Sequence, residues 1–299
     1  MSPRANLLGV PNFSEGRSER VIGALRASLG EHAHVLNVHF DPEHNRSVFT
    51  VAGEREALGD ALVAGAQHAL ELIDMRAQQG LHPCIGALDV CPVVWLVDEQ
   101  REEARGVALE VAQRIATLEV PVFLYGDLAA SPERRERAYF RRGGPVGLAR
   151  RMAEGELAPD LGPAAPHPRA GATLVTARRP LVAFNLELDT PNPEIARAIA
   201  AELREAGGGI EGVRAIGLPR QGGGAQVSVN VHDPAAISLG RLAREVRRLA
   251  GRHGAGVVEA ELVGLAPEVA LRGYEEGPPI RDFDPDTHLI ERRLAALDR

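Results

Sequence analysis

The sequence predicts a mixed α/β (α+β) protein with two ferredoxin-like domains of the βαββαβ type, in which mixed or antiparallel sheets carry helices on one face. Short apolar runs alternate with longer segments of helical periodicity. The second half follows the order strand, helix, strand, strand, helix, strand, which is the split βαβ pattern. The first half begins with the same order and adds a further helix and strand. We therefore expect an N-terminal domain of residues 1–179 and a C-terminal domain of residues 180–299 with a helical tail.

In the first half, five apolar runs predict strands. They are Asn6–Val10, Val35–Val38, Val48–Val51, Val93–Val97 and Val120–Tyr125. Helical periodicity predicts four helices between them. These helices are 14–30, 54–75, 98–117 and 131–152. Ser14 is the predicted N-cap of the first and Asp98 the predicted cap of the third. The fourth is broken at Gly143–Pro145. Residues 155–171 are rich in proline, glycine and alanine, and they predict a long loop.

In the second half, four runs predict strands. They are Leu181–Leu188, Val213–Leu218, Ala225–Val231 and Val257–Leu262. Helices are expected from Thr190 to about Gly207, over Pro234–His253 and, at the terminus, over His288–Leu297. A turn is expected at Gln221–Gly224. The terminal helix is a candidate either for packing on the body of the protein or for a dimer contact, and we expect a homodimer.

Composition excludes several classes of function. The net charge is −7, arginine supplies every basic side chain other than histidine, and there is no lysine to act as base, nucleophile or Schiff-base former. The sequence has no basic run interleaved with aromatic residues, so nucleic acid is not an expected partner. It also has no apolar stretch long enough to span a membrane. Cys84 and Cys91 lack the spacing of a zinc site or a redox dithiol, so we expect reduced thiols and a cytoplasmic protein.

The segment from Gly80 to Pro92 carries the clearest candidate for chemistry. Its two glycines and two prolines predict an ordered loop. His82 has a free pKa near neutrality, which suits proton transfer, and Pro83 restricts its backbone. Asp89 can orient a histidine or bind a polar ligand. Taken alone, the pattern also fits a turn whose histidine is solvated or hydrogen-bonded in the core.

This loop resembles that of a known family. His82-Pro83 followed by Gly86-Ala87-Leu88-Asp89-Val90 and Pro92 is similar to the histidine loop of the glutamate formiminotransferases. Other similar stretches follow in the family's order, from near Val10 to near Pro267. They are 10–17 (VPNFSEGR), 44–48 (HNRSV), 72–75 (LIDM), 183–185 (AFN), 225–230 (AQVSVN) and 262–265 (LVGL).

The resemblance implies a formiminotransferase without the fused cyclodeaminase domain. Such an enzyme moves the formimino group of N-formimino-L-glutamate to tetrahydrofolate, its co-substrate, in histidine breakdown and one-carbon metabolism. The resemblance implies that His82 is the general acid and base. One positioned imidazole can first accept a proton from the attacking amine and then donate one to the leaving nitrogen.

The resemblance also implies a set of binding residues. Guanidinium groups bind carboxylates as bidentate forks, so Arg17 and Arg46, in matched stretches, are candidates for the substrate carboxylates. Asn12, Asn45 and Gln226 can supply neutral hydrogen bonds. The folate-lining loop corresponds to Gly162, Pro163, Ala164, Ala165, Pro166, His167, Pro168, Arg169, Ala170 and Gly171. Arg169 can meet an anionic tail there, although without the resemblance this segment fits an ordinary proline-rich linker.

The sequence departs from the family near the imidazole. Leu81 and Cys84 stand where members commonly carry glutamate and arginine, and Ala77, Gln78 and His39 also replace charged residues. Polar partners of His82 are therefore expected to be missing or moved. Two alternatives stay open: formyl transfer or processing of 5-formyltetrahydrofolate, and a folate-binding protein without turnover. The histidines at 32, 34, 39 and 44 lack zinc-site spacing, and we expect no metal.

Overall fold

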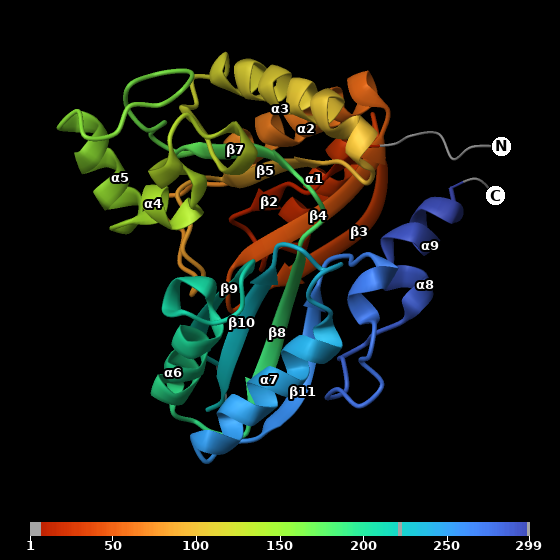
Figure 1. The fold of residues 1–299 in the computed structure, drawn as a ribbon. Coiled ribbons are helices and arrows are strands. Elements are labelled where there is room, and N and C mark those ends of the chain that lie inside the picture. The colour runs from red at the N-terminus through yellow and green to blue at the C-terminus, as the bar shows by residue number, and fades with distance from the viewer. Residues whose placement is uncertain (1–6, 221–222, 298–299) are drawn as a thin grey trace. The chain divides into compact units, whose positions relative to one another are not determined.

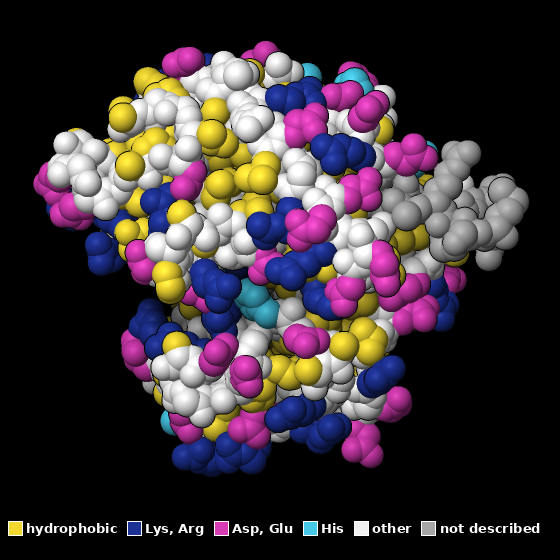
Figure 2. All heavy atoms as spheres, turned by 45° about the horizontal axis from the view of Figure 1, so that its top comes forward, with side chains coloured by type: hydrophobic (Ala, Val, Ile, Leu, Met, Phe, Trp, Pro, Cys, Tyr) yellow, Lys and Arg dark blue, Asp and Glu magenta, His cyan; other side chains and the backbone are white. Residues whose placement is uncertain are grey.

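The computed structural model describes residues 7–220 and 223–297 and divides into two compact units, Met1–Arg178 and Arg179–Arg299 (Figure 1). Both units combine a β-sheet with α-helices, which confirms the mixed α/β class. Among the described residues, no helix is both long and apolar enough to cross a membrane. On the face drawn in Figure 2, arginine and acidic side chains are interspersed.

The first unit contains a seven-stranded sheet in the order β3–β4–(β1, β2)–β5–β7–β6, in which β1 and β2 both pair with β4 and β5. Strand β7 runs parallel to β5 and β6, and the other pairs are antiparallel. Its strands are β1 (Leu7–Gly9), β2 (Asn12–Phe13), β3 (His34–Asp41), β4 (Arg46–Gly53), β5 (Leu88–Val94), β6 (Val122–Leu124) and β7 (Thr173–Arg178). Its helices are α1 (Glu19–Gly30), α2 (Arg55–Leu72), α3 (Arg101–Ala116), α4 (Arg137–Arg141) and α5 (Gly144–Ala153).

Two apolar cores cover opposite faces of the β6 side of this sheet. Val122 belongs to the main core, which is formed with helices α1, α2 and α3. Phe123 belongs to a smaller core with Phe140 and Leu148, from α4 and α5. Successive strand residues point to opposite faces, so α4 and α5 add a layer on the second face, which is packed against the segment that carries His82.

The second unit contains a four-stranded antiparallel sheet in the order β11–β8–β10–β9. Its strands are β8 (Val182–Leu188), β9 (Val213–Pro219), β10 (Ala225–Val231) and β11 (Val257–Val263), and its long helices are α6 (Pro193–Leu203) and α7 (Leu239–Arg252). The short helices α8 (Pro285–His288) and α9 (Ile290–Ala295) follow. The order of strands and helices predicted for this half is present. Phe184, Val227 and Leu262 from its strands enter a core with both long helices.

Three local predictions were wrong. Ser14 does not cap α1; it is buried and donates to the Gly86 carbonyl at 2.7 Å, while Ser18 forms the N-cap. Strand β7 (Thr173–Arg178) was not expected between the proline-rich loop and the domain boundary. Strand β5 begins at Leu88 rather than at Val93, because Leu88 and Val90 already pair with Phe13 and Asn12 of β2.

Other expected elements differ mainly at their ends. Asp98 lies inside a short 3₁₀ turn before α3 rather than at its cap, and α7 begins at Leu239, after its N-cap Ser238. The predicted terminal helix, His288–Leu297, corresponds to the shorter α9, and α8 precedes it. The start of the first predicted strand, Asn6, and part of the predicted turn at 221–224 lie outside the described residues.

Candidate active site

A pocket of about 200 Å³ lies in the first unit around His82. Its walls come from the β2 end, the β3–β4 hairpin, the histidine loop and the start of β5. The lining residues are Phe13, Ser14, His44, Asn45, Arg46, Gln78, His82, Cys84 and Asp89. The pocket therefore brings together four of the predicted site residues, Asn45, Arg46, His82 and Asp89.

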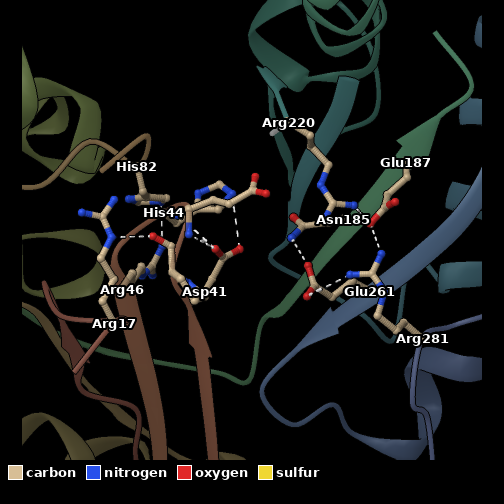
Figure 3. Close-up of polar contacts among 12 residues, drawn as sticks. Arg17, Asp41, His44, Arg46, His82, Asn185, Glu187, Arg220, Glu261 and Arg281 are labelled. Carbon is tan, nitrogen blue, oxygen red and sulfur yellow. Dashed lines mark hydrogen bonds and ion pairs between the residues drawn. The ribbon is translucent and has the colours of Figure 1, made fainter. Parts of the chain in front are cut away.

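The contacts of His82 fix its protonation state. Nε2 lies 2.6 Å from Nη1 of Arg46 (Figure 3), and Nδ1 lies 2.9 Å from the carbonyl oxygen of Pro83. A guanidinium has only donors, so Nε2 must accept. Nδ1 then carries the proton and donates it to the Pro83 carbonyl. The half-buried ring is thus a neutral imidazole whose basic nitrogen faces a cation.

The electrostatic surroundings hold the pKa of His82 well below its usual 6.5. Burial is the largest cause, because it disfavours the charged form, and the positive charges of Arg46, Arg141 and Arg137 act in the same direction. Leu81, which precedes His82 in the chain, is 39% exposed. The polar neighbours expected to be missing are therefore replaced by arginines from β4 and α4.

Arg46 is held at the first residue of β4. Its Nη2 donates to Oδ1 of Asn12, while Nη1 contacts His82, so both ends of the fork are engaged. Burial and the nearby charges of Arg141 and Arg137 lower the pKa of Arg46 to about 9. Arg46 remains a cation at neutral pH, and Nε is buried without a hydrogen-bond partner among the described residues.

A buried amide network fixes the hairpin that carries Arg46. Asn45 has φ of 48°, a left-handed conformation that asparagine tolerates better than most residues. Its Oδ1 accepts from Gly16 N–H at 3.0 Å, and its Nδ2 donates to Gln78 Oε1 at 3.1 Å. Gln78 in turn donates to the carbonyls of Ser14 and Asn45. Asn45 is thus a framework residue, and the role of Gln78 was not predicted.

Asp89 fixes the other side of the pocket. Its Oδ1 accepts from Ile85 N–H at 2.8 Å, and its Oδ2 pairs with Nη2 of Arg141 from α4. The carboxylate is nearly fully buried, at 4% side-chain exposure. Burial and then the Asp89 charge raise the pKa of the Cys84 thiol, so Cys84 stays protonated and is a poor nucleophile. Arg141 had no signal in the sequence beyond an arginine-rich helical segment.

The predicted folate loop contacts the histidine loop through its last residues. Ala87 N–H donates to the Ala170 carbonyl at 2.9 Å, and Ala172 N–H donates to the Ile85 carbonyl at 3.0 Å. The two backbones come so close at Gly86 that a Cβ there would lie 1.9 Å from the Ala172 carbonyl oxygen. Position 86 therefore requires glycine. None of the residues from 162 to 171 lines the pocket around His82.

Two predicted arginines have other partners. Arg17 donates through Nε to the Pro42 carbonyl at 2.8 Å, at the edge of the hairpin turn. Arg169 donates to the Glu71 carbonyl at 3.2 Å and lies 3.7 Å from Asp74, near the end of α2. In the described structure neither side chain lines the pocket.

The second unit carries a polar sheet face opposite its core. Gln226 lies there on β10, is buried, and its Nε2 has no partner among the described residues. Nearby on this face, Arg281 pairs with Glu187 (Figure 3) and with Glu259. Arg220 also pairs with Glu187, and Asn185 donates to Glu261 at 2.9 Å. This cluster is largely neutralised by its own members.

Comparisons with known proteins agree with the motifs. Residues 7–178 match the N-terminal subdomain of the formiminotransferase domain, and residues 183–273 match the formiminotransferase domain itself. The chain is 40% identical over 290 residues to a glutamate formimidoyltransferase of Streptococcus pyogenes, covering 95% of this chain and 97% of that protein. It is 35% identical to a glutamate formimidoyltransferase of Thermoplasma acidophilum, covering 90% and 93% of the two chains. It is 38% identical to the formimidoyltransferase-cyclodeaminase of Rattus norvegicus, covering 88% of this chain and 50% of that protein.

Proposed function

Since the chain belongs to the formiminotransferase family, we propose that it transfers the formimino group of N-formimino-L-glutamate to tetrahydrofolate. Glutamate and 5-formiminotetrahydrofolate are the products, and the reaction serves histidine breakdown and one-carbon metabolism. The main structural support is the neutral imidazole of His82, whose basic Nε2 faces a pocket beside a cation. An unprotonated imidazole is the form needed to accept a proton from the attacking amine.

His82 would act through Nε2. Nδ1–H is held by the Pro83 carbonyl, which fixes the tautomer and leaves Nε2 as the basic atom. N5 of tetrahydrofolate attacks the amidine carbon, and Nε2 takes its proton as the new bond forms. The lowered pKa of His82 keeps Nε2 unprotonated at neutral pH.

Arg46 must leave His82 before this can happen, because its Nη1 occupies the Nε2 lone pair. A carboxylate of formiminoglutamate is a stronger partner for a guanidinium than a neutral imidazole, since charge-assisted bidentate pairs are the stronger hydrogen bonds. We propose that the incoming carboxylate draws Arg46 from His82 and from Asn12. Substrate binding would thereby expose the base, and Asn12 would be free to bind the ligand.

The reacting end of the ligands would occupy the pocket around His82. The remaining binding roles stay proposals: the loop Gly162–Gly171 for folate, Arg17 and Arg169 for anionic groups, and Gln226 for a hydrogen bond. The unpaired buried Nε2 of Gln226 supports a ligand acceptor there, since buried amides are usually hydrogen-bonded.

No step of this chemistry needs a metal. Among the described residues, no group of three or more histidine, cysteine, aspartate or glutamate side chains is arranged to hold a metal ion. Tetrahydrofolate is the co-substrate rather than a resident cofactor. We also keep the proposals of a cytoplasmic protein and of a homodimer. Fractionation of cells tests the first, and light scattering on the purified protein tests the second.

The assay that tests the function compares two donors with tetrahydrofolate. We expect formiminoglutamate, and not formylglutamate, to give a folate product that is detected spectroscopically, with one glutamate released per transfer. Turnover of formylglutamate alone would favour the formyl-transfer alternative. Tight tetrahydrofolate binding without turnover of either donor would favour the folate-binding alternative. That alternative assumed the loss of polar groups around His82, whereas arginines surround it.

Arg46→Lys should be strongly impaired, although it keeps the charge. A lysine ammonium is a point donor and cannot replace a planar fork, so we expect the KM for formiminoglutamate to rise by about tenfold or more, as one charged hydrogen bond of about 1.5–3 kcal/mol is lost. Steady-state kinetics measure this. The matched control is Arg55→Lys, at an exposed ion pair with Glu110, which should behave as wild type. Unchanged kinetics of Arg46→Lys would contradict the bidentate role.

A further inference from the structure

A second imidazole, His44, shares the pocket with His82. The two ring centroids are 6.0 Å apart, the ring planes are inclined by 53°, and both side chains line the cavity (Figure 3). His44 lies in the turn between β3 and β4, and its side chain is 11% exposed. The mechanism above uses one imidazole for the first proton transfer and leaves this one without a role.

The two imidazoles have opposite electrostatic partners. His82 Nε2 faces the Arg46 cation, whereas His44 Nε2 lies 3.7 Å from Oδ2 of Asp41, an ion-pair partner for a protonated ring. Asp41 is itself fixed, because its Oδ1 accepts the backbone N–H groups of Glu43 and His44 at 2.7 and 3.0 Å. The other titratable groups lining the pocket are Arg46, Cys84 and Asp89.

We propose that His44, as imidazolium, donates the proton to the departing glutamate nitrogen, while His82 is the base toward N5 of tetrahydrofolate; this assignment rests on the proposed function. Pairs of titratable groups whose surroundings favour opposite charge states commonly divide acid and base roles in this way. Formimino transfer needs both roles within one adduct. With two imidazoles, His82 need not carry its proton from N5 to the leaving nitrogen within the lifetime of the adduct.

The proposed steps balance. N5 of tetrahydrofolate attacks the carbon of the protonated formimino group, the N5–C bond forms, and the C=N π pair moves to the terminal nitrogen. Nε2 of His82 takes the N5 proton. His44 then gives its proton to the glutamate nitrogen, which departs with the C–N bond pair, while the terminal nitrogen lone pair re-forms the C=N bond. Return of one proton from His82 to His44, directly or through water, restores both rings.

The test is the pH dependence of turnover in His44→Gln. We expect the wild-type kcat to fall on the basic side, where the imidazolium is lost, and His44→Gln to lose this basic limb and about 10²-fold or more of kcat. Binding of glutamate and tetrahydrofolate, measured by calorimetry, should change little. His32→Gln, at an exposed histidine outside the pocket, is the matched control and should keep the wild-type profile.

Asp41→Asn provides a second test that does not remove the ring. Asparagine retains an oxygen for the two backbone N–H groups but loses the charge, so protonated His44 loses its ion-pair partner. The basic limb should then move to lower pH. A basic limb that is unchanged in both His44→Gln and Asp41→Asn would overturn the proposal while leaving the proposed function intact. A wild-type protein without formiminoglutamate turnover would instead reject the proposed function.

Discussion

His82→Ala is expected to keep the fold and tetrahydrofolate binding while losing most turnover. A general acid or base typically contributes on the order of 10²- to 10⁴-fold in rate. The side chain is half-buried on a loop, and its hydrogen bonds are to Arg46 and to its own neighbour Pro83, so its loss leaves the main core intact. Turnover with formiminoglutamate and tetrahydrofolate, together with thermal unfolding, measures both parts of the expectation.

The pH profile distinguishes proton transfer from other roles of the ring. Burial and the surrounding arginines lower the pKa of His82, so the acid limb of kcat/KM in the wild type should lie below pH 6.5. His82→Asn can keep a hydrogen bond but cannot move a proton, so it should be as slow as His82→Ala. Both variants should lack that limb. Near wild-type turnover in His82→Ala would mean that another group is the base.

Acid should also destabilise the wild type through the same group. The folded-state pKa of His82 is lowered relative to the unfolded chain, so the unfolded chain binds more protons as pH falls below about 6.5. The free energy of unfolding should therefore decrease as the pH falls below that value. The loss should be smaller in His82→Asn, which has no imidazole at this position. Urea unfolding of the two proteins between pH 7 and pH 5 measures the difference.

The periodicity of the sequence predicted the second unit well, because its strands bury one face and alternate regularly. Val227 faces the core while its neighbour Gln226 lies on the polar face, as a period of two requires. The first unit was harder to predict. Strand β7 completes its sheet by parallel pairing with β5 and β6, and parallel partners that are distant in sequence leave no local turn signal.

The candidate site was predictable only where chemistry coincided with a motif. His82, Arg46, Asn45 and Asp89 were named from the sequence and line one pocket. Arg141 could not be named, because its role depends on α4 packing against the histidine loop on one face of the sheet. Ser14 was assigned to the wrong role, because a serine before a helical pattern resembles an N-cap. Its hydroxyl instead donates a hydrogen bond to the Gly86 carbonyl.

The ion pair between Asp89 and Arg141 gives the largest expected effect on stability. Both side chains are largely buried, at 4% and 10% exposure. Removing one partner leaves a buried charge uncompensated, which typically costs about 3–5 kcal/mol. Arg141→Met should therefore lower the free energy of unfolding by about that amount. Arg150→Met, which breaks an exposed pair with Glu154, is the control and should cost at most about 1 kcal/mol.

A second variant separates the lost ion pair from a packing defect. Asn at position 89 keeps an oxygen for Ile85 N–H, which Asp89 now holds at 2.8 Å, but carries no charge. The double variant Asp89→Asn, Arg141→Met should therefore recover part of the stability lost in Arg141→Met, because no buried charge remains unpaired. Urea unfolding of the wild type, the two single variants and the double variant measures the coupling free energy between the two side chains. If the double variant is less stable than Arg141→Met by the full cost of Asp89→Asn, the two side chains are not coupled, and the buried ion pair does not hold the histidine loop against α4.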